Sequence, residues 1–317
     1  MGAAGSAEDR AGPGQRRDHA AAQGEGVSEI TVVQERRLGY AFLAPLTLLL
    51  LGLAVFPGLY AYYLSALDAS LETFRSPRFI GLANYVRVLT DREFYGAVAF
   101  SVRYTLIVVT LELVLGLALA IALNRELRGK RFLVSLLLLP LMVSPVLLGI
   151  MFRLTLNEFI GTVSYYLRAA GFPGNLLAPP YVPYTLMTVD VVQWTPFTFL
   201  ILYAGLRSIP DEPVEAAIVD GAGGWQILRF VVLPLLRPLL LTAAFLRGID
   251  AFKTFDTIQI LTAGGPGSLT TTASIYVYKT AFLTGHLGRA NAAVVILLLL
   301  LSIPMSRAIR HILRSTP

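Results

Sequence analysis

Residues 95–123 read YGAVAFSVRYTLIVVTLELVLGLALAIAL, and this apolar stretch decides the class of fold. It is longer than the ~20 residues that a helix needs to cross the ~30 Å hydrocarbon core of a bilayer. Further runs of this kind lie at Leu38–Leu67, Phe132–Leu154, Tyr184–Leu206, Leu235–Leu261 and Ala290–Ile309. A backbone inside a bilayer must satisfy its polar groups internally, as a helix does. The sequence therefore predicts an all-α membrane protein with about six transmembrane helices.

The composition agrees with a membrane protein and excludes several other classes. Only 15% of the 317 residues are charged, whereas a soluble protein carries roughly 25%. The mean hydropathy is +0.66, so the pI near 9.6 does not indicate a protein that binds nucleic acid. The chain has no cysteine, and His19, His286 and His311 form no metal pair at helical spacing. We therefore expect neither an enzyme nor a metal or cofactor site in this chain.

The positions of Lys and Arg predict how the chain crosses the membrane. The link Asn124–Arg131 holds Arg125, Arg128, Lys130 and Arg131, and both tails of the chain are also basic. Cytoplasmic loops carry an excess of these residues, so we expect this link and both termini in the cytoplasm, with the chain in the plasma (inner) membrane. Residues 1–34 lack apolar periodicity and a signal-peptide core, which predicts a disordered tail that stays attached to a membrane domain of residues 35–317.

This topology places the connection of about residues 207–235, between the fourth and fifth spans, in the cytoplasm. Ser208 and Asp211 are spaced like a capping box, and Gly221 can close a helix in the left-handed conformation. The pattern predicts two short helices joined at Gly221, the second running to Pro234, both at the membrane surface. An amphipathic linker that rests on lipid headgroups would show a similar pattern.

The same connection resembles the "EAA" signature of the permease subunits of ABC importers. The signature falls on Glu215, Ala216, Ala217, Gly221, Val231, Leu233 and Pro234, with valine at 231 where the family usually has isoleucine. The sequence Asp220-Gly221-Ala222 is typical of the carbohydrate-uptake branch. Further similar segments are Phe79–Tyr85, Leu139-Pro140 with Ser144–Val146, Trp194–Phe197, and Asp250–Asp256 with Leu261–Gly267. The resemblance covers nearly everything from Arg37 onward. Within the family, the chain is similar to the maltose- and glycerol-3-phosphate-type sugar permeases. It lacks the extra N-terminal spans and the large periplasmic insert of the maltose-system subunit, so it resembles the compact form.

The resemblance implies a division of labour between several chains. In that family the loop helix docks on an ATP-binding subunit, so the residues implied in coupling are Glu215, Ala216, Ala217, Asp220, Gly221 and Ala222. The chain has no Gly-x-x-x-x-Gly-Lys-Ser/Thr phosphate loop, so ATP and Mg²⁺ would bind to a partner ATPase dimer. The other implied partners are a second homologous permease, an extracytoplasmic solute-binding protein and membrane lipid. The implied substrate is a sugar, oligosaccharide or sugar-phosphate-like polyol.

Polar residues inside the predicted spans are costly and therefore mark a possible solute path. The fifth span carries Arg247, Asp250, Lys253 and Asp256, which alternate in charge and could either neutralise one another along the helix or form a polar wall. The fourth span offers Gln193, Trp194 and Thr195, a set that suits sugar binding but also suits ordinary contacts between helices. Glu112 of the second span is expected to satisfy a neighbouring helix.

A different class of transporter remains compatible with the sequence. A secondary transporter or channel for a small polar solute would work alone, and its central cytoplasmic connection would be a mere linker. The two hypotheses differ in whether changes at Glu215 or Gly221 separate ATP hydrolysis from transport.

Overall fold

A computed structural model describes residues 40–315 apart from residues 74, 126 and 173, and the predicted tail 1–34 lies outside these residues. The described chain divides into two units, of which the first ends at Tyr60 and the second begins at Ala61. The first unit is the greater part of an apolar helix, Tyr40–Ser65, in which the rings of Phe56 and Tyr60 stack 6.1 Å apart.

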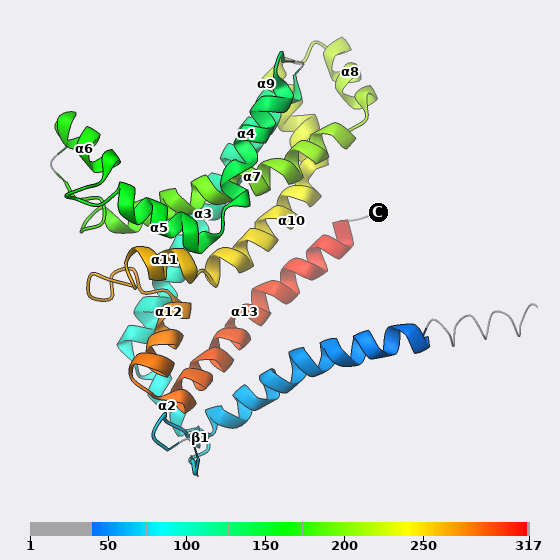
Figure 1. Cartoon of the computed structure of the whole chain (residues 1–317). Coiled ribbons are helices and arrows are strands. Elements are labelled where there is room, and N and C mark those ends of the chain that lie inside the picture. Colours follow the sequence, from blue (N-terminus) through cyan, green and yellow to red (C-terminus); the bar gives the residue numbers. More distant parts are fainter. Residues whose placement is uncertain (1–39, 74, 126, 173, 316–317) are drawn as a thin grey trace, which may run out of the picture. The chain divides into compact units, whose positions relative to one another are not determined.

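The second unit is almost entirely helical (Figure 1). Two short strands, β1 (Leu67–Asp68) and β2 (Arg78–Phe79), pair antiparallel with Leu67 opposite Phe79. The helices are α2 (Ala83–Leu89), α3 (Arg92–Asn124), α4 (Lys130–Met142), α5 (Pro145–Thr155), α6 (Thr162–Ala169), α7 (Val182–Ser208), α8 (Asp211–Val219), α9 (Gly224–Ile227), α10 (Leu233–Phe252), α11 (Asp256–Leu261), α12 (Ala273–Tyr278) and α13 (Leu287–Ser315), with π-helical turns η2 (Leu228–Val232) and η3 (Lys279–Leu283).

The predicted all-α membrane fold is confirmed. Within the described residues, five helical stretches are long and apolar enough to cross a membrane, namely Tyr40–Ser65, Arg92–Asn124, Val182–Ser208, Gly224–Leu261 and Leu287–Arg307. A sixth is the bent pair α4 and α5. These stretches coincide with the six apolar runs of the sequence.

The third run, which the sequence indicated as one span over Phe132–Leu154, consists of two helices. Helices α4 and α5 meet at an angle of 94°, with Val143 and Ser144 in extended conformations between them. Pro145 causes the break because proline has no N–H to donate and disfavours a helical conformation in the residue before it. Proline then suits the first turn of the new helix, which is where α5 begins.

Helices α3, α7 and α10 pack side by side and form the centre of the second unit (Figure 1). Two glycines allow the close approach. A Cβ at Gly116 of α3 would lie 2.9 Å from the backbone nitrogen of Phe199 on α7, and one at Gly205 of α7 would overlap Leu239 Cδ1 on α10. Small residues at such crossings bring backbones together, as is common between membrane helices.

At one end of α3, an ionic cluster joins three elements. Asp91, the N-cap of α3, accepts a hydrogen bond of 2.6 Å from the Tyr276 hydroxyl of α12. It also forms an ion pair with Arg289 of α13. Burial opposes ionisation of Asp91, but the hydrogen bonds from Tyr276 and from the Glu93 backbone N–H, together with the Arg289 charge, outweigh it and lower the pKa of Asp91.

The close approach of α3 and α7 makes Gly116→Ala a test of this packing. The added methyl has no space, so we expect a loss of about 1–3 kcal/mol of stability, measured as a lower unfolding temperature in detergent. Gly96→Ala on the same helix is the matched control, because a Cβ there meets nothing within 4 Å. Equal unfolding temperatures for the two variants would contradict the packing described.

The lowered pKa of Asp91 predicts a dependence of stability on acid. The folded-state pKa lies below the ordinary value of 3.8, so the contribution of Asp91 is complete above about pH 4 and is lost as the pH falls through the folded-state value. Asp91→Asn should therefore lower the unfolding temperature at neutral pH and flatten its decline below about pH 4. Asp68→Asn is the control, since Asp68 pairs with Arg87 where both side chains are more than half exposed. An unchanged acid profile in Asp91→Asn would refute the assignment.

Candidate functional site

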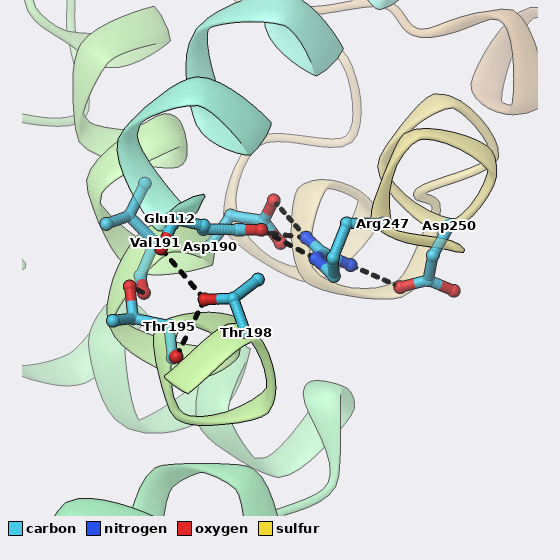
Figure 2. Close-up of polar contacts among 7 residues, drawn as sticks. All are labelled: Glu112, Asp190, Val191, Thr195, Thr198, Arg247 and Asp250. Atoms are coloured by element: carbon cyan, nitrogen blue, oxygen red, sulfur yellow. Dashed lines mark hydrogen bonds and ion pairs between the residues drawn. The ribbon is translucent and has the colours of Figure 1, made fainter. Parts of the chain in front are cut away.

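The most polar place in the helical centre is formed around Arg247 of α10 (Figure 2). The guanidinium is 1% exposed and binds three carboxylates. Its Nε and Nη2 donate to Glu112 of α3 at 2.6 and 2.8 Å, Nη2 also contacts Asp190 of α7 at 3.2 Å, and Nη1 donates to Asp250 at 2.6 Å. Each guanidinium nitrogen therefore has a carboxylate partner, which is what a charge buried this deeply requires.

The carboxylates come from helices far apart in the sequence. Glu112 is fully buried and meets Arg247 in a bidentate pair across α3 and α10, which confirms the expectation that Glu112 satisfies a neighbouring helix. Asp190 is 3% exposed and is not among the residues predicted from the sequence. Its position inside an apolar span was the available signal, because an ionisable residue within a membrane helix marks a functional or paired site.

A hydroxyl network supports this ion cluster from the α7 side. The Thr198 Oγ1 lies 2.8 Å from the backbone oxygen of Glu112 and 2.9 Å from that of Thr195 (Figure 2). Thr198 is fully buried, and its hydroxyl occupies the space that a Cβ on Gly116 of α3 would need. The close crossing of α3 and α7 thus fixes the position of Glu112 along the helix axes, and with it the place where Glu112 meets Arg247.

A polar hollow of about 230 Å³ lies beside the ion cluster. It is lined by Pro145, Trp194, Asp250, Lys253, Thr254, Phe255, Asp256 and Thr257. The Trp194 ring centroid is 4.7 Å from the guanidinium carbon of Arg247, and Lys253 Nζ is 3.5 Å from Asp250 Oδ1. Asp256 is the first residue of α11, where the helix dipole stabilises its negative charge. The arrangement offers aromatic surface together with carboxylate acceptors and an ammonium donor.

The structure brings together only some of the residues expected on a solute path. Trp194, Asp250, Lys253 and Asp256 line one hollow, with Arg247 behind them. Gln193 and Thr195 are buried instead. Gln193 donates its Nε2 to the Val143 carbonyl at 3.2 Å, and Thr195 donates to the Val191 carbonyl at 2.6 Å.

The charges of α10 do not form the simple ladder along one helix that their spacing suggested. Arg247 pairs with Asp250, and Asp250 pairs with Lys253, but Arg247 also forms its bidentate pair with a carboxylate of α3. Among the described residues no ion pair joins Lys253 to Asp256, because α10 ends at Phe252 and α11 begins only at Asp256. The break turns these side chains toward the hollow.

At the opposite end of α7, helix α8 occupies the predicted connection (Figure 1). Gly221 ends the turn after α8 with a φ of +81°, and the Ala222 N–H donates to the Ala217 carbonyl at 2.9 Å. This is the glycine closure that the sequence indicated. The capping box at Ser208 and Asp211 was wrong, because Ser208 still belongs to α7 and its hydroxyl donates to the Gly205 carbonyl. Pro210 takes the N-cap position of α8.

The second short helix of the prediction was also wrong as a separate element. Helix α9 continues through the π-helical turn η2 into α10, so residues 224–232 form the first turns of the fifth span. Pro234 lacks an N–H, and the adjoining turn widens so that the Leu233 N–H reaches the Leu228 carbonyl. Such π-turns absorb a local misfit without ending a helix.

In the part of the chain that the structure describes, every residue of helix α8 is exposed or half-buried. Glu215, Ala216 and Asp220 are exposed, and Ala217 and Ala222 are half-buried. Three large apolar side chains are also exposed here, since Ile218 is 59%, Val219 87% and Trp225 67% accessible. Apolar side chains gathered beside charged ones on an exposed helix are typical of a surface that another protein or the membrane covers.

A helical membrane centre with a polar hollow and an exposed helix between two spans defines a membrane transport component, and comparison with known proteins agrees. Residues 112–316 match the family of binding-protein-dependent transport system inner membrane components. The chain belongs to this family. It is therefore a multi-pass inner-membrane permease subunit of an ABC importer and not an enzyme.

Individual relatives cover most of the chain. It is 36% identical over 248 residues to the trehalose/maltose transport system permease protein MalF of Thermococcus litoralis, covering 78% of this chain and 84% of that protein. It is 32% identical over 275 residues to the sn-glycerol-3-phosphate transport system permease protein UgpA of Agrobacterium fabrum, covering 85% and 92%. The fold is similar to that of a chain in the crystal structure of a bacterial alginate ABC transporter with its periplasmic protein, with a TM-score of 0.76, 19% identity, and 88% and 94% coverage.

The ion cluster predicts a large difference between two substitutions of basic residues that are close in sequence. Arg247→Met leaves Glu112 and Asp190 buried without a cation, which should cost about 3–5 kcal/mol of stability. Lys253→Met removes a partner that is 66% exposed and should cost no more than about 1 kcal/mol. Unfolding temperature and monodispersity in detergent measure both effects.

A double variant separates charge from packing. Glu112→Gln combined with Arg247→Met removes one buried carboxylate together with the cation, so it should recover part of the lost stability. If the Arg247→Met variant were as stable as Lys253→Met, the ion cluster would not make the predicted contribution to the stability of the protein.

Proposed function

We propose that this chain forms half of the translocation path of an ATP-driven sugar importer and couples that path to a separate ATPase subunit. The observation that carries the proposal is the exposed helix α8, inserted between the two spans that carry the walls of the polar hollow. Both the apolar side chains Ile218 and Val219 and the charged Glu215 are available there to a partner surface. A partner subunit that covers these side chains would account for their exposure.

Two helices connect α8 to the hollow. Helix α7 leads into α8 and carries Trp194, while α10 follows α9 and η2 and carries Arg247 and Asp250. A displacement of α8 by a closing ATPase would act on both helices at their near ends. Coupling is assigned to Glu215, Ala216, Ala217, Asp220, Gly221 and Ala222, of which Gly221 fixes the turn and the alanines allow a close approach.

The chemistry of the hollow supports a sugar as the solute. Two relatives are named for the polyhydroxylated solutes trehalose/maltose and glycerol-3-phosphate. Carboxylates and an ammonium group next to the indole of Trp194 suit a sugar ring, whose hydroxyls form hydrogen bonds and whose C–H faces stack on aromatic rings. The volume of about 230 Å³ is below the ~300–1,000 Å³ of complete ligand sites. We therefore assign this chain one wall of the path, lined by Trp194, Asp250, Lys253 and Asp256, with Arg247, Gln193 and Thr195 in support behind it.

The remaining partners follow from the family. We assign ATP and Mg²⁺ to a dimer of ATP-binding subunits, the other wall of the path to a second homologous permease, and delivery of the sugar to an extracytoplasmic solute-binding protein. Both termini and α8 would then face the cytoplasm, in agreement with the basic residues of the Asn124–Arg131 link. The turn Ala263–Gly267 would then lie on the outer side. Its backbone is tightly turned, with positive φ at Ala263, Gly264 and Gly267.

The coupling assignment predicts that Glu215→Lys separates two activities. In the complete importer reconstituted in proteoliposomes, sugar uptake should fall at least ~10-fold because the reversed charge opposes its partner on the ATPase, while the permease stays folded. ATP hydrolysis should lose its stimulation by the loaded binding protein. Glu72→Lys makes the same charge change at an exposed residue between β1 and β2 and is the control.

Two outcomes would contradict the proposal. Uptake that survives Glu215→Lys, or that needs no ATP, would indicate a transporter that works alone. Purification of the tagged chain in mild detergent gives a second readout, because the importer should retain an ATP-binding subunit and a second permease, and recovery of the chain alone would count against both partners.

A further inference from the structure

The charges around the hollow determine which kind of sugar it can accept, an inference that rests on the proposed function. The relatives do not settle this point, because one is named for the neutral sugars trehalose and maltose and another for the anion glycerol-3-phosphate. We infer that the path accepts neutral sugars and disfavours anionic ones such as sugar phosphates and uronates.

The first step is that Arg247 is not available to an anion. Its three guanidinium nitrogens are all within 3.2 Å of carboxylate oxygens of Glu112, Asp190 and Asp250, and the side chain is 1% exposed. An anionic solute would have to displace one of these carboxylates, which would then lack a cation. The guanidinium therefore stabilises the site and does not recognise the solute.

The second step concerns the groups that the solute would meet. Among the described residues that line the hollow, Lys253 is the one cation, and it lies 3.5 Å from the Asp250 carboxylate. Asp256 lines the same hollow and is exposed, and the part of the chain that the structure describes gives it no ion-pair partner. Arg153 of the neighbouring α5 is turned to the Ile260 carbonyl and does not line the hollow.

The third step is the sum of formal charges. Behind the hollow, Arg247 is paired with the buried carboxylates of Glu112 and Asp190. Among the described residues that line the hollow, the two carboxylates of Asp250 and Asp256 outnumber the one ammonium group of Lys253, so the formal charge of the lining is negative. Repulsion between like charges therefore disfavours an anion in this hollow, and salt should weaken that repulsion. A neutral sugar loses nothing to this field and gains acceptors for its hydroxyl groups.

The aromatic lining supports the same choice. Trp194 and Phe255 both border the hollow, and the C–H faces of a pyranose ring pack against such rings without any need for charge. A phosphate or carboxylate group has no comparable partner there. The combination of aromatic surface, carboxylate acceptors and a lysine that pairs with Asp250 is thus matched to a neutral polyhydroxylated ring.

The test measures equilibrium binding to the complete importer in lipid nanodiscs without its binding protein, so that selection by the binding protein is removed. The probes are trehalose and maltose as neutral sugars, and trehalose 6-phosphate and a glucuronate-containing disaccharide as anions of similar size. Titration calorimetry or saturation-transfer NMR gives the Kd values. We expect the anions to bind at least ~10-fold more weakly than the neutral sugars, with a smaller difference at ~1 M salt.

Variants at Asp256 locate the origin of the preference. Asp256→Asn should narrow the gap between the two kinds of sugar, and Asp256→Lys should close or reverse it. Glu158→Gln and Glu158→Lys are the matched controls, because Glu158 is an exposed acid outside the hollow that bonds to Asn175, and they should leave the gap unchanged.

The possible results separate this inference from the proposed function. Anions that bind as well as neutral sugars, or a preference that Asp256→Lys leaves intact, would overturn the inference while the sugar importer stands. An assembled, ATP-hydrolysing complex that neither binds nor transports any of the four probes or other saccharides would overturn the proposed function as well.

Discussion

The structure of the helical centre depends on one buried guanidinium. Arg247 connects α3, α7 and α10 through Glu112, Asp190 and Asp250, so each of its nitrogens keeps a carboxylate only while the three helices hold this arrangement. An unpaired charge at membrane depth costs several kcal/mol, whereas a pair with complete hydrogen bonds is tolerated. Because loosely packed helices would expose the pairs or pull them apart, the cluster restricts the relative height and rotation of all three helices.

Close packing and the ion cluster depend on each other. Gly116 lets α3 approach the Thr198–Phe199 backbone of α7, and Gly205 does the same for α7 and the Leu239 side chain of α10. With larger residues at the two glycines, the helix axes would move apart and the carboxylates would no longer reach Arg247. The apolar chains supply little net attraction between helices in lipid, so small residues and polar pairs carry much of the specificity.

Local features of the sequence predicted much of the fold, whereas contacts between distant residues were not predictable. Hydropathy indicated the six apolar runs, and Gly221 indicated the end of α8, because both depend on a few neighbouring residues. The spacing on the fifth span left open whether Arg247 pairs along its own helix or lines a polar wall, and its pairing with Glu112 was not predicted. Glu112 precedes Arg247 by 135 positions, and local sequence does not indicate which distant helices meet. The bend before Pro145 was missed for a related reason, because prolines are tolerated inside spans wherever neighbours satisfy the freed carbonyls.

Those freed carbonyls explain why the hollow lies where it does. The chain is irregular within the apolar spans at Val143–Ser144 and at Lys253–Phe255, and a non-helical backbone at membrane depth is stable only with partners from the protein. Gln193 donates to the Val143 carbonyl, Ser274 to that of Lys253 at 2.9 Å, and Thr272 to that of Thr254 at 3.2 Å. The sequence made Gln193 a candidate for the solute path. This side chain is buried instead because its amide donates to the Val143 carbonyl, which the break leaves free. These side chains satisfy the carbonyls that the two breaks leave free, and beside the breaks Trp194, Asp250 and Lys253 line one hollow.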